Sequence, residues 1–274
     1  MTGIDVAEEL ARLPAQPLAA LAVLRLAEDP EASPADLGRL VETDPALCAR
    51  VMRLANSHRS GAHGPIRSAS RAVLQLGFQT VKGVAAAAAT SLLADDVDLG
   101  PVDQWVHSVA VASGASAAAA LVGVPEHEAF SAGLLHDVGA LVLHRADPRT
   151  FARVRSEAAG GTATSLAEAE RAAFGTSHAD AGADALEIWE FPGSFVDAVR
   201  RHHDPVATLR PLGQAVVLGE AVAAAVEPVD VGEPQPSLEA TLEALGIPRG
   251  SARMLVAGAR DATSEVAGFL GGSR

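Results

Sequence analysis

The chain of 274 residues contains no tyrosine, two tryptophans, one lysine (Lys82) and one cysteine (Cys48). A single cysteine excludes an internal disulfide framework and is typical of proteins of the reducing cytoplasm. The first ten residues, MTGIDVAEEL, include acids and no apolar segment of the kind that directs export. The low-charge stretch from Trp105 to Val124 is too weakly apolar for a convincing membrane span. We therefore expect a soluble, cytoplasmic protein with no membrane attachment.

Aromatic residues make up only 3% of the chain, so the core must be built from alanine, leucine and valine. Alanine is the best helix former, and apolar residues recur at helical spacings of three and four without strand-like alternation. This pattern predicts an all-α protein. The charged segment ADDVDLGP separates an expected amino-terminal half, residues 10–98, from a second half, residues 99–226. Residues 227–274 are expected to form a linker and carboxy-terminal helices.

Capping signals predict where several helices begin. Ser33 before Pro34 is a typical helix start, and Asp44 before Pro45 repeats the device. Two serine–aspartate pairs are read as capping pairs of two later helices: Ser177 with Asp180, and Ser194 with Asp197. Other helices are expected over residues 18–28, 68–76, 80–93, 105–122, 126–138, 151–159, 166–174, 212–226, 238–245 and 252–269.

The formal net charge of −13 argues against broad, sequence-independent binding to nucleic acid. Between Pro45 and Ala94, however, there is no acidic residue, while six basic residues fall there: Arg50, Arg53, Arg59, Arg67, Arg71 and Lys82. This basic stretch could dock onto the acidic remainder of the molecule. Alternatively, its arginines face a protein partner or an anionic small ligand. Both alternatives remain open at this point.

The apolar helical run from Ala129 to Leu143 carries an adjacent His136–Asp137 pair. An ionisable pair in a buried stripe must be paired or ligated, because burying an unpaired charge is costly. Alternatively, the pair lies at the solvent edge of the stripe, or caps the helix at Gly139 as a stop signal. Further histidines lie in other predicted helices: His107, His178, His202 and His203. Neutral imidazole and carboxylate are standard ligands of Zn, Fe, Mn and Ni, and several helices can project them into one pocket.

Several motifs together resemble the HDOD family, the HD-related output domains of bacterial signalling proteins. LPAQP, TDPALCARVMRLANS and AVLQLGF match its amino-terminal part, and WVHS, AFSAGLLHDVG, WEFP and VRRHHDP follow in the order of the family. The resemblance covers about residues 10–208. It implies a multi-helix architecture in which an amino-terminal bundle packs on an HD-type half. It also implies a regulatory role in signal transduction through protein or ligand binding.

This family is a branch of the HD metal-dependent phosphohydrolase superfamily, and the resemblance implies a ligand set for one or two ions of Fe, Mn or Zn. One ion would take His107, His136, Asp137 and Glu220. The second would share Asp137 and take His178, His202 and His203. Glu220 stands where the superfamily normally has an aspartate.

Two departures from the catalytic members disfavour an enzyme. Cyclic-dinucleotide phosphodiesterases of the superfamily have the motif HDxGK, and here Ala140 occupies the lysine position. Lys82 lies in the other half, the GYP signature is missing, and HDOD proteins have no generally established catalytic activity. We therefore assign no catalytic residue and favour a binding module. The alternative is a metal-dependent phosphohydrolase acting on a nucleotide or cyclic nucleotide.

Overall fold

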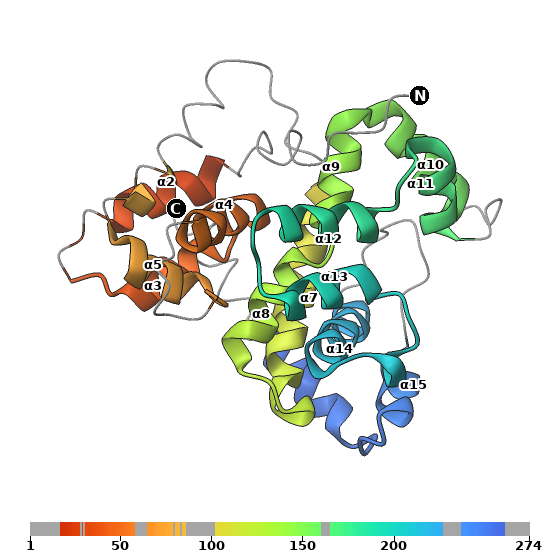
Figure 1. Ribbon diagram of the computed structural model, residues 1–274. Coiled ribbons are helices and arrows are strands. Elements are labelled where there is room, and N and C mark those ends of the chain that lie inside the picture. The colour runs from red at the N-terminus through yellow and green to blue at the C-terminus, as the bar shows by residue number, and fades with distance from the viewer. Residues whose placement is uncertain are drawn as a thin grey trace.

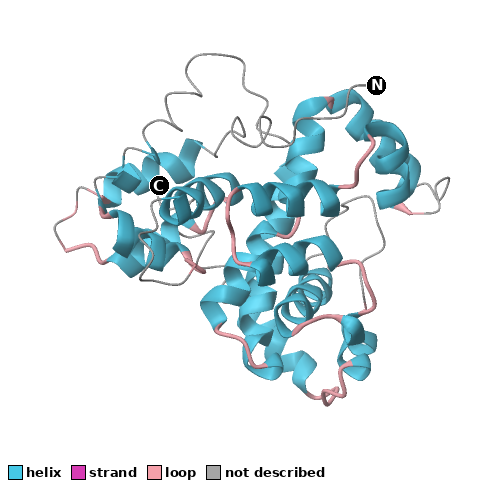
Figure 2. Ribbon diagram, in the orientation of Figure 1, coloured by secondary structure: helices cyan, strands magenta, loops and turns pink. Residues whose placement is uncertain are grey.

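A computed structural model describes residues 17–27, 29, 31–57, 65–78, 80–82, 84–85, 102–159, 165–226 and 237–260. Within these ranges every regular element is a helix and none is a strand, as Figure 2 shows. The all-α prediction is confirmed. No helix in the described part is long and apolar enough to cross a membrane.

The amino-terminal half consists of four described helices that lie together at one side of the molecule (Figure 1): α2 (Pro17–Leu26), α3 (Pro34–Val41), α4 (Pro45–Ser57) and α5 (Ala69–Leu76). The predicted start of α3 is confirmed in detail. The side chain of Ser33 accepts a hydrogen bond from the backbone N–H of Asp36, and the Asp36 carboxylate accepts one from the backbone N–H of Ser33. Of the helix expected over residues 80–93, residues 80–82 and 84–85 are helical and residues 86–93 lie outside the described ranges.

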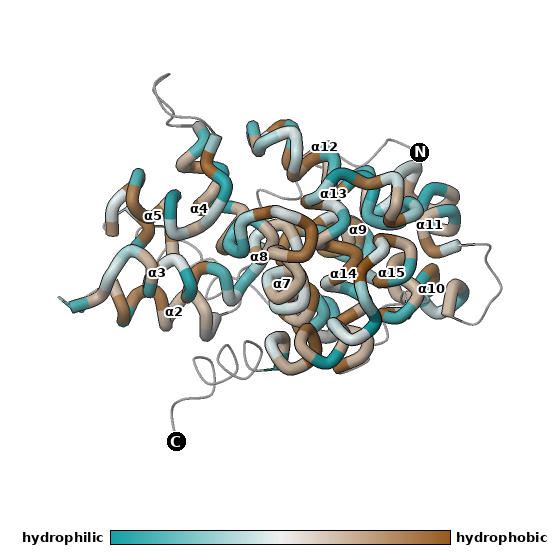
Figure 3. The backbone as a smooth tube through the Cα atoms, turned by 90° about the horizontal axis from the view of Figure 1, so that it is seen from below, coloured by the Kyte–Doolittle hydropathy of each residue, from teal (hydrophilic) through white to brown (hydrophobic). Residues whose placement is uncertain are grey.

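The second half, called the HD half here after its His136–Asp137 pair, contains these helices: α7 (Val102–Val122), α8 (Glu126–Leu135), α9 (Val138–Ala146), α10 (Pro148–Ala159), α11 (Leu166–Phe174), α12 (His178–Ile188), α13 (Gly193–Arg201), the 3₁₀ turn η1 (Val206–Thr208) and α14 (Pro211–Val226). Helix α14 is apolar along most of its length and packs against α7, α8 and α13, so it forms the centre of this half (Figure 3).

Beyond α14, helix α15 (Leu238–Ala244) and a helical segment over residues 251–260 pack onto the outer side of α7 and α14. Their buried side chains Leu242 and Leu255 form a small separate core with Leu218 of α14. The remainder of the helix expected over residues 252–269 lies outside the described ranges.

The two halves share one continuous apolar core. Leu47 and Met52 of α4 belong to the same buried cluster as Leu134 and Leu135 of α8 and Phe195 of α13. Burial of apolar surface of this kind is the main contribution to stability, at about 25 cal/mol per Å². The amino-terminal half is therefore packed onto the HD half.

Candidate metal centre

The HD pair lies where two helices meet. Helix α8 ends at Leu135 and α9 begins at Val138, because Asp137 has a non-helical backbone with φ −105° and ψ 17°. The expected single helix from Glu126 to Val138, within a continuous run to Leu143, is therefore wrong. The Asp137 side chain caps neither helix, and the pair is buried, with His136 0% and Asp137 5% exposed. The break in the helix turns the carboxylate into the interior instead.

Gly139 is not a stop signal, since it lies within the first turn of α9. A Cβ atom on Gly139 would lie only 2.0 Å from the backbone oxygen of His178. The absent side chain thus lets α12 approach α9 at backbone distance, which brings His178 beside the HD pair. Gly219 of α14 has a similar function, because a Cβ there would lie 2.5 Å from the backbone oxygen of Val111 in α7. That approach brings the neighbouring Glu220 into the same interior.

The carboxylate of Asp137 lies between two groups of histidines. Its Oδ2 atom is 3.8 Å from His107 Nε2 and 3.5 Å from His136 Nε2. Its Oδ1 atom is 3.6 Å from His178 Nε2 and 3.4 Å from His202 Nε2. Two donor atoms bound to one ion at about 2.0–2.2 Å lie roughly 3–3.5 Å apart. The observed separations therefore suit one ion on each side of the carboxylate.

The two remaining predicted ligands adjoin this arrangement. Glu220 Oε1 lies 3.6 Å from His136 Nε2, and the two residues group with His202. His203 Nε2 lies 2.7 Å from His178 Nε2, and these histidines also group with His202. All seven side chains expected from the sequence are thus brought to one place. The grouping differs in one respect, because Glu220 lies near His136 and His202 and is not grouped with His107.

Backbone carbonyls fix the orientation of two of the imidazoles. His136 Nδ1 lies 2.7 Å from the carbonyl oxygen of Gly133, and His202 Nδ1 lies 2.6 Å from that of Val199. A carbonyl oxygen only accepts, so in each ring Nδ1 carries the proton and Nε2 has the free lone pair. Both lone pairs face Asp137. This is the arrangement that metal-binding histidines adopt.

Three polar residues that the sequence did not single out support the ligands. The buried Glu170 accepts a hydrogen bond from His178 Nδ1 at 2.6 Å. Gln104 Nε2 donates to Asp137 Oδ2 at 2.8 Å, and Arg155 in turn donates to Gln104 Oε1 at 2.7 Å. Carboxylate–histidine pairs and hydrogen-bonded ligand carboxylates are typical of the surroundings of metal ligands.

Two of these three could have been found from local spacing. Glu170 falls four residues after Leu166, on the buried stripe of α11, where an acid needs a partner. Gln104 lies three residues before His107 and so shares its helix face. Arg155 carries no such signal, because it meets Gln104 across 51 residues of sequence.

The electrostatics suit cation binding. Burial lowers the pKa of His136 to about 3 and also lowers the pKa of His107, so these rings are neutral near pH 7. Burial alone would raise the pKa of Asp137, but the surrounding histidines outweigh it and hold that pKa well below its ordinary value. His136 and His107 are thus neutral imidazoles beside an ionised carboxylate, which is the protonation state that metal binding requires.

Several of the inward-facing atoms have no hydrogen-bond partner within the described residues: His136 Nε2, Asp137 Oδ1 and His202 Nε2. Each unpartnered buried polar atom costs about 1–3 kcal/mol. One or two divalent cations would satisfy all three atoms at once. The residues present therefore fit a metal centre.

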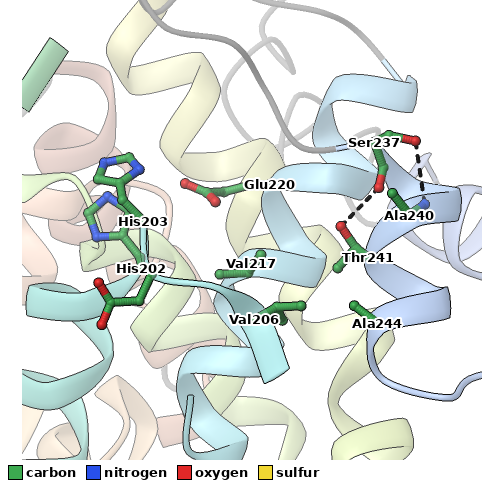
Figure 4. A pocket seen from close by; sticks show the side chains of 10 residues that line it. His202, His203, Val206, Val217, Glu220, Ser237, Ala240, Thr241 and Ala244 are labelled. Atoms are coloured by element: carbon green, nitrogen blue, oxygen red, sulfur yellow. Dashed lines mark hydrogen bonds between the residues drawn. The ribbon is translucent and has the colours of Figure 1, made fainter. Parts of the chain in front are cut away.

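A pocket of about 370 Å³ opens onto one side of this centre. Figure 4 shows His202, His203 and Glu220 on one wall, with Glu220 directed toward the histidines, and Ser237 and Thr241 on the opposite wall. The opposite wall comes from α15. Of the described residues that line the pocket, none is lysine or arginine.

Two of the predicted basic residues contact the HD half. Arg67 donates to Glu128 Oε2 at 3.1 Å and to Ser194 Oγ at 3.3 Å, both in the HD half. The Arg53 guanidinium lies over the ring of Trp189, 5.2 Å from its centroid. The side chains of Arg50 and Arg71 differ in exposure, since Arg50 is partly buried, which lowers its pKa, and Arg71 is exposed. Arg59 lies outside the described residues.

Two further expectations concern Ser194 and Ala140. Helix α13 has Pro192 at its N-cap, so the predicted capping pair of Ser194 with Asp197 is wrong. The other predicted pair is confirmed, since Ser177 caps α12 by accepting from the backbone N–H of Asp180. Ala140 packs in a small apolar cluster with Leu143, Phe151 and Ala181.

Known proteins that this chain resembles include a response regulator and an HDOD domain protein. The chain resembles the MmoQ response regulator of Methylococcus capsulatus str. Bath, with 27% identity, a TM-score of 0.69 and coverage of 89% of this chain and 98% of that one. An HDOD domain protein of unknown function from Geobacter sulfurreducens gives 26% identity and a TM-score of 0.51, with 96% of each chain covered. An uncharacterized protein of Treponema pallidum is 22% identical over 203 residues, which are 73% of this chain and 39% of that protein. The chain thus spans well under half the length of that curated relative. The HDOD domain family matches residues 13–205, and the chain belongs to this family.

Proposed function

We propose that this protein is a cytoplasmic bacterial signal-transduction module that works by binding, and that its HD half holds one or two divalent transition ions, Fe, Mn or Zn. The signalling part of the proposal is supported by membership of the HDOD family and by the likeness to a response regulator. The metal part is supported by the geometry around Asp137.

One observation carries the metal proposal: both oxygens of the buried Asp137 carboxylate face imidazole Nε2 atoms, and three of these atoms have no hydrogen-bond partner in the described part of the chain. Asp137 would bridge the ions. His107 and His136 would hold the first ion and His178, His202 and His203 the second, while Glu220 would bind on the side of His136 and His202. Glu170 and Gln104 would orient the ligands without touching the ions.

A second candidate function is metal-dependent hydrolysis of a phosphate ester. The pocket that opens onto His203 and Glu220 favours it, since bound ions would lower the pKa of a water molecule and neutralise a phosphoryl group. Two features weigh against it. The described lining residues include no lysine or arginine to hold a phosphate, and Ala140 packs in the apolar core where the catalytic members have lysine. Binding is therefore the preferred function.

Elemental analysis of protein purified without a histidine tag tests the metal centre. We expect about one or two transition ions per chain in the wild type. The change His136→Ala/Asp137→Ala should abolish metal binding, while His127→Ala, at an exposed histidine outside the centre, should leave the metal content unchanged. Ions present at about a thousandfold above their Kd would stabilise the fold by about 4 kcal/mol, so chelator should lower Tm. A metal-free wild type whose Tm does not respond to chelator contradicts the proposal.

Product analysis with cyclic dinucleotides and with simple nucleotides separates the two functions. We expect no turnover above trace level in metal-loaded protein. Metal-dependent product formation that disappears in Asp137→Ala would establish the phosphohydrolase instead.

A further inference from the structure

A second pocket, of about 670 Å³, lies at the seam between the two halves, far along α8 from the HD pair. We call it the seam groove. It is formed by the loop before α5, the outer face of α5 and the first turn of α8, and its lining residues are Pro65, Ile66, Arg67, Arg71, Leu74, Gln75, His127 and Glu128. None of these residues belongs to the candidate metal centre.

The walls of the seam groove are held in place by hydrogen bonds. The backbone N–H of Ile66 donates to Asn56 Oδ1 at 2.9 Å, and Gln75 Nε2 donates to the carbonyl oxygen of Ala55. Arg67 ties the α5 side to the α8 side through Glu128. A pocket with walls fixed in this way loses little conformational entropy when a ligand binds.

The groove combines positive charge with exposed apolar surface. Glu128 is the one acid among the described lining residues, and Arg67 already pairs with it. Arg71 makes no side-chain hydrogen bond or ion pair with any described residue. One turn further along the same helix face, the side chain of Leu74 is 63% exposed, among the most exposed large apolar side chains of the described chain.

We propose that the seam groove binds an acidic peptide segment of a partner protein, in which carboxylates flank an apolar side chain. The carboxylates would pair with Arg71, whose planar guanidinium suits bidentate contacts, and the apolar side chain would cover Leu74. A free phosphate or other small anion would leave Leu74 exposed. Nucleic acid is disfavoured because the molecule as a whole carries a charge of −13 and repels long polyanions.

This inference rests on the proposed binding role but not on the metal centre. It also narrows the partner surface that the sequence suggests. Of the predicted arginines, Arg53 and Arg67 are engaged with the HD half, whereas Arg71 faces the groove. The two proposals can thus fail separately, since metal analysis does not depend on Arg71 and peptide binding does not depend on Asp137.

A random peptide library displayed on phage, panned against the full-length protein, tests the proposal. We expect the enriched peptides to combine aspartate or glutamate with leucine, isoleucine or phenylalanine. A synthetic fluorescent peptide of the enriched sequence should bind about tenfold or more weakly to Arg71→Glu, and more weakly at high salt. Leu74→Ser should weaken binding independently of salt. The control Arg253→Glu, at an exposed arginine of the carboxy-terminal helical segment, should bind like the wild type.

Circular dichroism and Tm measurements establish that each variant is folded, which is expected because the Arg71 and Leu74 side chains are both exposed. The proposal is wrong if panning yields no peptide, or if the enriched peptides lack acidic residues. It is equally wrong if they bind Arg71→Glu as tightly as the wild type. Competition by inorganic phosphate or a short RNA at lower concentration than the peptide would assign the groove to that ligand instead.

Discussion

The candidate metal ligands of the HD half turn inward, whereas the predicted arginines of the amino-terminal half that the structure describes include Arg53 and Arg67, which lie against the HD half, and the exposed Arg71. The seven candidate ligands come from α7, the junction of α8 and α9, α12, the end of α13 and α14, and six of them are buried. In the amino-terminal half, Arg53 of α4 and Arg67 of the loop before α5 contact the HD half, and Arg71 of α5 is exposed.

This difference shows that the sequence predicts a site of buried ionisable residues better than a site of exposed ones. Buried histidines and carboxylates must satisfy each other or an ion, so their positions are constrained together. Water can hydrogen-bond to an exposed guanidinium in any orientation. The residues that an exposed arginine contacts therefore depend on how its segment of the chain packs, and its own sequence pattern does not predict them. Three substitutions, or pairs of substitutions, test how far the two halves differ in this respect.

The largest effect is expected from a substitution that prevents the close contact of α9 and α12. In Gly139→Ala the new Cβ would overlap the backbone oxygen of His178 at 2.0 Å, so α12 must move and His178 must leave the centre. Overpacking costs about 1–3 kcal/mol, and a clash with backbone belongs at the upper end. We expect a lower Tm together with the loss of at least one metal ion per chain.

Gly38→Ala provides the matched control in the amino-terminal half. There the new Cβ would lie 2.4 Å from Ser70 Oγ, at the contact of α3 with α5, which is also too close. This variant should lose a similar amount of stability and keep its metal. Equal metal content in both variants would show that the helix crossing at Gly139 does not position the centre.

Sequence patterns predicted the local features and missed those that depend on tertiary contact. The start of α3 at Ser33 follows from neighbouring residues alone, and so does the cap at Ser177. The break at Asp137 could not be read from periodicity, because apolar residues continue on both sides of it. Ser194 resembles a cap in sequence, but its hydroxyl faces Arg67, which is distant in the chain.

The candidate ligands were predictable for a different reason. His107, the His136–Asp137 pair and the His202–His203 pair lie in motifs that follow the order of a known family, and order in the chain is kept even when helix ends shift. The supporting residue Arg155 belongs to no such motif, and its contact with Gln104 joins two separate helices. Its role therefore appears only once α7 and α10 are placed in space.

The next largest effect concerns a carboxyl group buried between the halves. Glu42 Oε1 accepts hydrogen bonds from the backbone N–H of Ala69 at 3.3 Å and from Ser131 Oγ at 3.2 Å, and so joins α3, α5 and α8. Burial raises the pKa of Glu42 from 4.5 to about 7, although these bonds and the nearby charge of Arg39 oppose the rise. The folded protein therefore retains this proton at pH values where the unfolded chain has lost it.

The sign of the pH effect follows from the raised pKa. The contribution of Glu42 to stability is fully present below pH 4.5 and is lost as pH rises toward 7, by roughly 3 kcal/mol in total. Glu42→Gln keeps an acceptor oxygen for both hydrogen bonds and has no charge to bury. We expect urea unfolding at pH 8 to show the variant more stable than the wild type, with little difference near pH 4.5.

Glu157→Gln, at an exposed position of α10, is the control and should leave the pH profile unchanged. If Glu42→Gln and the wild type differed by the same free energy of unfolding at pH 5 and at pH 8, Glu42 would already be ionised in the folded state. In that case an ionised carboxylate is buried at the seam, and buried charge would not be confined to the HD half.

The smallest effect is expected at the ion pair that crosses the seam. Arg67 and Glu128 are 42% and 16% exposed at their side chains, so solvent screens their attraction, and exposed pairs of this kind contribute about 0.2–1 kcal/mol. A double-mutant cycle with Arg67→Ala, Glu128→Ala and both together isolates this coupling. We expect a coupling energy under about 1 kcal/mol that falls further in high salt, with unchanged metal content. A coupling of several kcal/mol would mean instead that the basic stretch is held in place by its own HD half. The charge of Arg67 would then serve to hold the two halves together, and Arg71 would remain for a partner.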